Sequence, residues 1–294
     1  MENITINISL PKPLLDGADK QAETELRNRS ELIREAIRNY LIDKSTGSDL
    51  IYTNEENIRI EALAKIKPLT DKVSLQLSAV FRPQPNIVPD LFKGGDSLLK
   101  KLIENPPSFR RGGWDLQTLD IAKPIAGAYL QLNNGDRKAL RFYRDGQFLF
   151  ALDYDFLGHG VNSGTEGNEF SINGLAAAES ITNFVYFIHE YKEFLSRPAG
   201  IAIVKIKLLN PKGVKMNLIG VRGNNNFNSR LGNAVELGSL EGQVQIDLTK
   251  GVDKDVAAYK MLAEFFYFFG IMDFDFLYVN REKGAVDISS FKKG

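Results

Sequence analysis

The sequence predicts an α+β protein in which a small N-terminal strand–helix–helix segment is joined to a larger α/β domain with an antiparallel or mixed sheet and two long helices. Three observations support this prediction. Residues 4–10 alternate between apolar and polar side chains, which is typical of a half-buried β-strand. The residues that follow repeat apolar side chains at helical spacing. From residue 108 onward, strand patterns are interrupted by two long helical patterns.

The composition limits the class of protein. The chain has 294 residues, of which 43% are hydrophobic and 25% charged, and a formal net charge of zero, as is ordinary for globular proteins. It contains no cysteine, which excludes disulfides, thiolate catalysis and nearly all structural zinc sites. The N-terminus has no basic segment leading into an apolar run, and no apolar run reaches about 18 residues. We therefore expect a cytoplasmic protein without a membrane span.

Two helices are predicted after the first strand. Pro11 and Pro13 end the strand, and apolar side chains then recur at helical spacing over residues 14–26. Ser30 is the expected N-cap of a second helix, whose apolar stripe covers residues 32–41. So small a unit cannot bury these apolar faces alone. We expect its strand to pair antiparallel with the same strand of a second chain.

This order of elements, and especially the stretch RSELIREAIRNYL at residues 29–41, resembles the ribbon-helix-helix repressors of the Arc and Met repressor type over roughly residues 3–44. The resemblance implies a homodimer or higher homo-oligomer whose two-stranded ribbon enters the major groove of double-stranded DNA. Outward ribbon residues would read base edges, and the start of the second helix would contact a phosphate. The DNA-binding residues that it implies are Thr5, Asn7, Ser9, Lys12, Arg29, Ser30 and Glu31.

The charge of this segment departs from the usual pattern of such ribbons. The outward face of the strand has no Arg or Lys, and residues 1–50 hold seven basic and nine acidic side chains. Because phosphate neutralisation supplies most non-specific affinity for DNA, we expect binding to be modest and sensitive to salt. The alternative interpretation is a dimerisation module that does not contact DNA.

The polar residues 44–54 predict a linker, and a helix to about residue 67, a strand at 73–81 and a short helix at 96–105 are expected after it. We divide the chain into a ribbon-helix-helix segment at 1–44, a connecting segment at 45–107 and an α+β sensor or oligomerisation domain at 108–294. In this last domain, Asn-Gly and Asp-Gly pairs predict tight hairpin turns. The aromatic stretch EFFYFFG at 264–270 is typical of a core or dimer contact.

Residues 108–216 resemble the C-terminal region of bacterial regulators that carry a divergent AlbA-type domain. The stretches RRGGWDLQT, KALRFYRDGQFLF and AIVKIKLLNPKGVKM carry this resemblance, which implies a sensing or oligomerising role. Guanidinium groups and aromatic faces could hold a small anionic or nucleotide-like ligand. The candidate ligand-binding residues are Arg110, Arg111, Trp114, Arg141, Tyr143, Arg144, His159 and Arg230. The alternative is that the arginines form ordinary ion pairs.

The common catalytic and metal-binding motifs are absent. The sequence has no phosphate-binding loop, dinucleotide-binding loop, nucleophile elbow or zinc-protease motif, and the stretch that begins at Asp153 lacks the closing Glu of a calcium loop. We expect no metal, no cofactor and no enzymatic activity, and a structural role for His189. The sequence therefore predicts a dimeric, sequence-specific DNA-binding transcriptional regulator, most simply a repressor. An antitoxin-like module that binds a partner protein and an enzyme with an unrecognised site in the C-terminal domain remain as alternatives.

Overall fold

The chain forms two compact units, residues 1–51 and residues 52–294. The computed structural model describes residues 52–64, 73–84, 98–109, 120–122, 130–134, 138–143, 145–158, 170–195, 199–218, 230–231, 234–249, 253–271, 279–280 and 282–287, with isolated residues 12, 15–17, 19, 20, 29, 113 and 115–117. All described residues of the first unit are helical. The predicted strand at residues 4–10 lies outside the described residues.

The second unit is built on a seven-stranded sheet in which every neighbouring pair is antiparallel. This confirms the antiparallel form of the predicted sheet. From one edge to the other the strands are β10 (Ser239–Asp247), β7 (Ile201–Leu209), β1 (Ser74–Arg82), β5 (Phe148–Leu152), β4 (Lys138–Phe142), β3 (Leu130–Asn134) and β2 (Asp120–Ala122).

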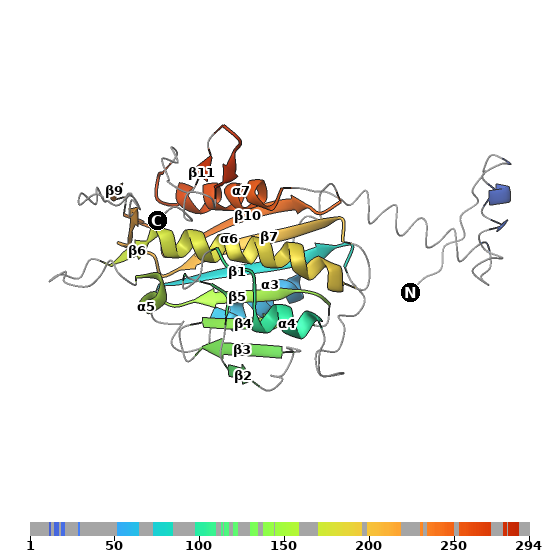
Figure 1. Cartoon of the computed structure of the whole chain (residues 1–294), viewed down its shortest axis with the longest axis horizontal. Helices are drawn as coiled ribbons and strands as arrows, with labels where there is room; N and C mark the ends of the chain where they lie inside the picture. Colours follow the sequence, from blue (N-terminus) through green and yellow to red (C-terminus); the bar gives the residue numbers. More distant parts are fainter. Residues whose placement is uncertain are drawn as a thin grey trace, which may run out of the picture. The chain divides into compact units, whose positions relative to one another are not determined.

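Helices lie on both faces of this sheet (Figure 1). One face carries α6 (Gly174–Tyr191), α7 (Lys254–Tyr267) and the short α4 (Leu98–Glu104). The other face carries α3 (Asn54–Ala64), which contacts β1 and β5. Because neighbouring strand residues point to opposite faces, Leu77 and Phe81 of β1 belong to the core under α6, whereas Ser78 faces α3.

The core under α6 is strongly aromatic. The ring of Phe148 on β5 lies 5.2 Å from that of Phe187 and 5.4 Å from that of Tyr191, and the ring of Phe142 on β4 lies 5.9 Å from that of Phe187. On α7, Phe265 is fully buried in the same core. Such tilted and edge-on ring pairs add stability beyond the area that they bury.

The position of β1 changes the domain boundary drawn from the sequence. From the sequence, residues 73–81 are expected in a connecting segment, but β1 lies in the middle of the sheet, between β5 and β7. Its partners are about 70 and 130 residues away in the sequence, so local patterns do not reveal the pairing. The compact unit begins at Tyr52, not at residue 108.

The Asp-Gly turn predicted between β4 and β5 is present. The backbone N–H of Tyr143 donates to the carbonyl of Gln147 at 2.9 Å, and Gly146 has a φ of 88°. Glycine adopts this left-handed conformation without steric cost. The turn therefore closes the hairpin that brings β4 beside β5.

Smaller elements complete the described part of the second unit. A three-stranded sheet contains β6 (Ser171–Asn173), β8 (Lys215–Leu218) and β9 (Arg230–Leu231), with β6 and β8 parallel. The remaining elements are α5 (Tyr154–Leu157), the 3-10 turn η2 (Lys192–Phe194) and the β11 (Val279–Asn280) and β12 (Ala285–Val286) pair.

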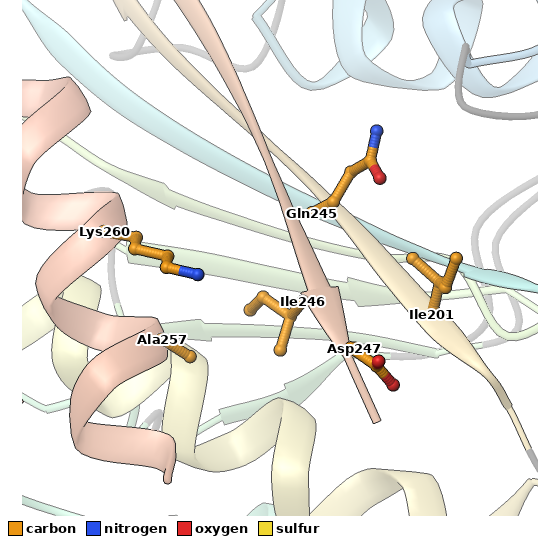
Figure 2. A pocket seen from close by; sticks show the side chains of 6 residues that line it. All are labelled: Ile201, Gln245, Ile246, Asp247, Ala257 and Lys260. Atoms are coloured by element: carbon orange, nitrogen blue, oxygen red, sulfur yellow. The ribbon is translucent and has the colours of Figure 1, made fainter. Parts of the chain in front are cut away.

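A pocket of about 290 Å³ lies between β10 and α7 at the end of the sheet (Figure 2). Its apolar lining comes from Ile201, Ile246 and Ala257. Gln245, Asp247 and Lys260 supply polar groups to its wall. We call it the β10–α7 pocket.

Candidate functional site

Two of the seven predicted DNA-binding residues are described by the structure. Lys12 and Arg29 are both helical and exposed, while Thr5, Asn7, Ser9, Ser30 and Glu31 lie outside the described residues. The Arg29 guanidinium binds the Asp19 carboxylate through Nε and one terminal nitrogen. A phosphate would have to compete with this carboxylate for the Arg29 guanidinium.

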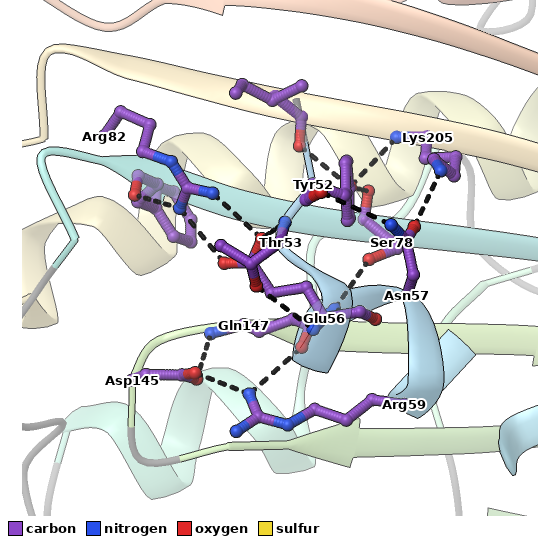
Figure 3. A network of polar contacts seen from close by, with 12 residues as sticks. Tyr52, Thr53, Glu56, Asn57, Arg59, Ser78, Arg82, Asp145, Gln147 and Lys205 are labelled. Atoms are coloured by element: carbon purple, nitrogen blue, oxygen red, sulfur yellow. Dashed lines mark hydrogen bonds and ion pairs between the residues drawn. The ribbon is translucent and has the colours of Figure 1, made fainter. Parts of the chain in front are cut away.

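The second unit starts with a polar network that fixes α3 to the sheet (Figure 3). The first turn of α3 has a capping box, in which the Thr53 hydroxyl accepts from the Glu56 N–H at 3.2 Å and the Glu56 carboxylate accepts from the Thr53 N–H at 2.7 Å. This reciprocal arrangement satisfies N–H groups that the start of a helix leaves without partners. The capping box of Thr53 and Glu56 therefore fixes the position at which α3 begins.

Tyr52, the first residue of the second unit, is 4% exposed. Its hydroxyl donates to the carbonyl of Ser78 at 2.7 Å, lies 3.1 Å from the carbonyl oxygen of Ile203 and accepts from the N–H of Lys205 at 3.2 Å. Burial is the largest cause that raises the pKa of this phenol far above its usual value. Tyr52 thus ties the chain to β1 and β7 at the point where the unit begins.

Glu56 connects α3 to β1 through an ion pair. Its carboxylate accepts from the Arg82 guanidinium at 2.9 and 3.1 Å, and Glu56 is 2% exposed. The buried amide of Gln147 donates to the Glu56 carbonyl at 3.1 Å and to the Ser78 hydroxyl at 3.3 Å. The buried Glu56 carboxylate thus has both an opposite charge and hydrogen-bond donors, without which its burial would be unfavourable.

Arg59 makes a second link, to the turn between β4 and β5. Its guanidinium pairs with the carboxylates of Asp145 and Glu55 and donates to the Gln147 side chain at 3.1 Å. Its Cζ atom lies 4.3 Å from the centre of the Tyr143 ring, a cation–π distance. Tyr143 is 4% exposed.

Lys205 on β7 completes the network. Its ammonium donates to the Asn57 side chain at 2.9 Å, pairs with Glu241 on β10 at 2.9 Å and lies 4.7 Å from the centre of the Tyr52 ring. The network thus joins α3 to β1, the turn between β4 and β5, β7 and β10. We refer to Tyr52, Glu56, Arg59, Arg82, Gln147 and Lys205 as the α3 network.

The structure describes only part of the predicted ligand-binding set. Arg141 and Tyr143 are close together on the sheet face that α3 covers, and both are buried. Arg230 belongs to β9, of which only the backbone is described. Arg110, Arg111, Trp114, Arg144 and His159 lie outside the described residues, so the ligand-binding role of the set stays a prediction. The Arg59 guanidinium already occupies one face of the Tyr143 ring.

Sequence reasoning did not single out Tyr52 or the buried carboxylate of Glu56. The signal for the helix start was present, because Thr53 and Glu56 have the Ser/Thr-x-x-Glu spacing of a capping box. No local signal indicates Arg82 or Lys205 as partners, since they lie 26 and about 150 residues away in the sequence.

Neither a metal centre nor a membrane helix is found in the described parts of the chain. Among those residues, no group of three or more His, Asp or Glu side chains is placed to hold a metal ion. The helices in these parts are too short or too polar to cross a bilayer.

Comparison with known proteins finds a family match for the N-terminal segment. Residues 4–44 match the family model described as ribbon-helix-helix protein, copG family, which confirms the resemblance of the N-terminal segment. No curated protein matches the chain. The match covers this segment alone, for which the ribbon-helix-helix fold implies DNA binding and dimerisation.

Proposed function

We propose that this chain, whose residues 4–44 belong to the ribbon-helix-helix family of the copG type, is a dimeric, sequence-specific DNA-binding transcriptional regulator that acts as a repressor. The family match is the observation that carries the proposal. The second unit, residues 52–294, would sense a ligand or extend the assembly, and the proposal assigns it no catalytic role.

The pattern of residues 4–10 supports the proposal. A ribbon made by two copies of this strand would bury Ile4, Ile6 and Ile8 and direct Thr5, Asn7 and Ser9 outward. Asn can bond an adenine through two hydrogen bonds, and a good bidentate contact discriminates by about 1–3 kcal/mol. By two-fold symmetry, the operator would contain short inverted or tandem half-sites.

The test is a fluorescence-anisotropy titration of the full-length protein against DNA from upstream of its own gene and against scrambled DNA, at two salt concentrations. We expect selective binding that weakens as salt rises. Asn7→Ala should remove most of the selectivity, whereas Asn28→Ala, the matched control, removes the same side chain from outside the strand and should preserve it. Equal binding to both DNAs at both salt concentrations would overturn the proposal.

An antitoxin-like role is the second candidate. The excess of acidic over basic side chains in residues 1–50 and the pairing of Arg29 with Asp19 favour it, because both weaken phosphate binding and leave room for a protein partner. Copurification of a second, distinct chain in a stable complex would support this role. A chain that purifies only with copies of itself would contradict it.

A further inference from the structure

Gln76 is a buried polar residue on β1, near the middle of the seven-stranded sheet. Neither its amide nitrogen nor its amide oxygen has a hydrogen-bond partner among the described residues. Such groups are rare in native proteins because they are destabilising, and a bound molecule that supplies the missing hydrogen bonds is one physical reason to keep them. Gln76 therefore marks a candidate binding position.

A row of side chains leads from Gln76 to β10. Gln76 lies two residues from Ser78 and thus on the same face of the sheet, the one that α3 covers. Its neighbours in register are Ala151 of β5 and Lys207 of β7, and Lys207 lies opposite Glu241 of β10. Directly opposed side chains start about 5 Å apart. Of the two neighbours of Gln76 in this row, only Lys207 has a polar side chain.

The positive charge at this row exceeds the negative charge. Lys205 and Lys207 share the carboxylate of Glu241, at N–O distances of 2.9 and 3.8 Å. The longer distance is beyond hydrogen-bond range, and no other carboxylate pairs with the Lys207 ammonium in the part of the chain that the structure describes. Because two ammonium groups share one carboxylate, an anion is favoured beside Lys207.

The row becomes more accessible toward β10. Gln76 is 2% exposed, whereas the side chains of Lys207 and Glu241 are 23% and 47% exposed. Exposure therefore rises step by step from β1 to β10. A small molecule that enters along the row meets the Lys207 ammonium before it reaches the Gln76 amide.

We propose that Gln76 and Lys207 bind a small oxyanion that has a hydroxyl group beside its acidic group, such as inorganic phosphate or a 2-hydroxy carboxylate. The acidic group accepts from the Lys207 ammonium and from Gln76 Nε2, and the hydroxyl donates to Gln76 Oε1. An oxyanion without a hydroxyl leaves Oε1 unpartnered and therefore binds more weakly. The role of this site rests on the proposed function, because it names the class of ligand that the second unit would sense.

Thermal unfolding of the full-length protein at neutral pH and constant ionic strength tests the site. Phosphate and glycolate are the probes, and sulfate and acetate are their counterparts without a hydroxyl. Sulfate and phosphate both stabilise proteins by exclusion from the surface, so the difference within each pair is the result. We expect at least one probe to raise the unfolding midpoint by about 2 °C or more above its counterpart. The pair that responds identifies the acidic group, and no difference within either pair would overturn the proposal.

Two variants test whether these residues form the site. Gln76→Met removes both amide atoms, and Lys207→Met removes the ammonium, so each should abolish the probe-specific shift. Gln76→Met should not lower the midpoint without probe, because it replaces an unpartnered buried amide by an apolar side chain of similar size. Gln245→Met and Lys260→Met, the matched controls at exposed positions, should keep the shift. A probe-specific shift that persists in Gln76→Met or in Lys207→Met would overturn the assignment.

The DNA titration separates this inference from the proposed function. A probe-specific shift without selective DNA binding would overturn the proposed function and leave the site in place. Selective DNA binding without a probe-specific shift would overturn the site and leave the regulator in place.

Discussion

Substitution of Glu56 tests whether the α3 network stabilises the second unit. Glu56→Ala removes the carboxylate that accepts from Arg82 and the acceptor for the Thr53 N–H. Arg82 then keeps a largely buried guanidinium, whose side chain is 16% exposed, without its carboxylate partner. The variant also leaves the first turn of α3 without half of its capping box.

The expected cost follows from these contacts. Removing one partner of a buried ion pair typically costs about 3–5 kcal/mol, and the partial exposure of Arg82 places this pair at the lower end. Loss of the cap adds about 1 kcal/mol. We therefore expect Glu56→Ala to lower the free energy of unfolding by about 3–4 kcal/mol. Arg82→Met should cost about 3 kcal/mol, and the double variant less than the sum, with a coupling of about 2 kcal/mol.

The assay is urea unfolding at fixed protein concentration, followed by circular dichroism and by the fluorescence of Trp114, the single tryptophan of the chain. Glu61→Ala is the control, because Glu61 is exposed on the same helix and should change stability by no more than about 0.5 kcal/mol. A cost for Glu56→Ala equal to that for Glu61→Ala, or strict additivity of the two network variants, would refute the role assigned to the ion pair.

Two further predictions concern buried polar groups of the second unit. Tyr52→Phe removes the hydroxyl that bonds to Ser78 and Lys205 and should cost about 1–3 kcal/mol in the same urea assay; an unchanged midpoint would contradict the anchoring role of the hydroxyl. His189 has a pKa lowered by burial and by the nearby charges of Lys192 and Lys254, partly opposed by Asp253, and its buried Nε2 atom has no hydrogen-bond partner among the described residues. Because the unfolded chain then binds the proton more tightly, stability should fall as pH drops below about 6.5. The measurement is thermal unfolding of both proteins between about pH 7 and 5, in which His189→Leu should lose less stability on acidification than the unchanged protein. An identical dependence of stability on pH for both proteins would contradict this role of His189.

Local patterns were sufficient for several elements of the second unit. The Asp-Gly pair correctly indicated the turn at Gly146. Tight hairpin turns need a residue with positive φ, and Gly146 adopts a φ of 88°. Alternation over 73–81 correctly indicated a strand, observed as β1. The start of α6 at Gly174 also depends on a neighbouring residue, because the Asn173 side chain caps this helix. Each of these features depends on residues that are close in the sequence.

Features that depend on residues far apart in the sequence could not be predicted from local patterns. The strand at 73–81 was assigned to a connecting segment because nothing local reveals that it pairs with Phe148–Leu152 and Ile201–Leu209. Arg141 and Tyr143 were candidates for a ligand site, and their burial under α3 could not be foreseen since α3 precedes them by about 80 residues. The sequence also gives no indication that Glu56 meets Arg82.

By itself, the sequence indicated the ribbon-helix-helix character of residues 4–44 and an α/β class with an antiparallel or mixed sheet for the larger unit, because periodicity, caps and turn residues act over a few neighbouring positions. Only the tertiary structure decided where the larger unit begins, which face of the sheet α3 covers and in which order the strands lie in the sheet. These depend on the order in which the strands pair, and that order is set by the burial of side chains that lie far apart in the chain.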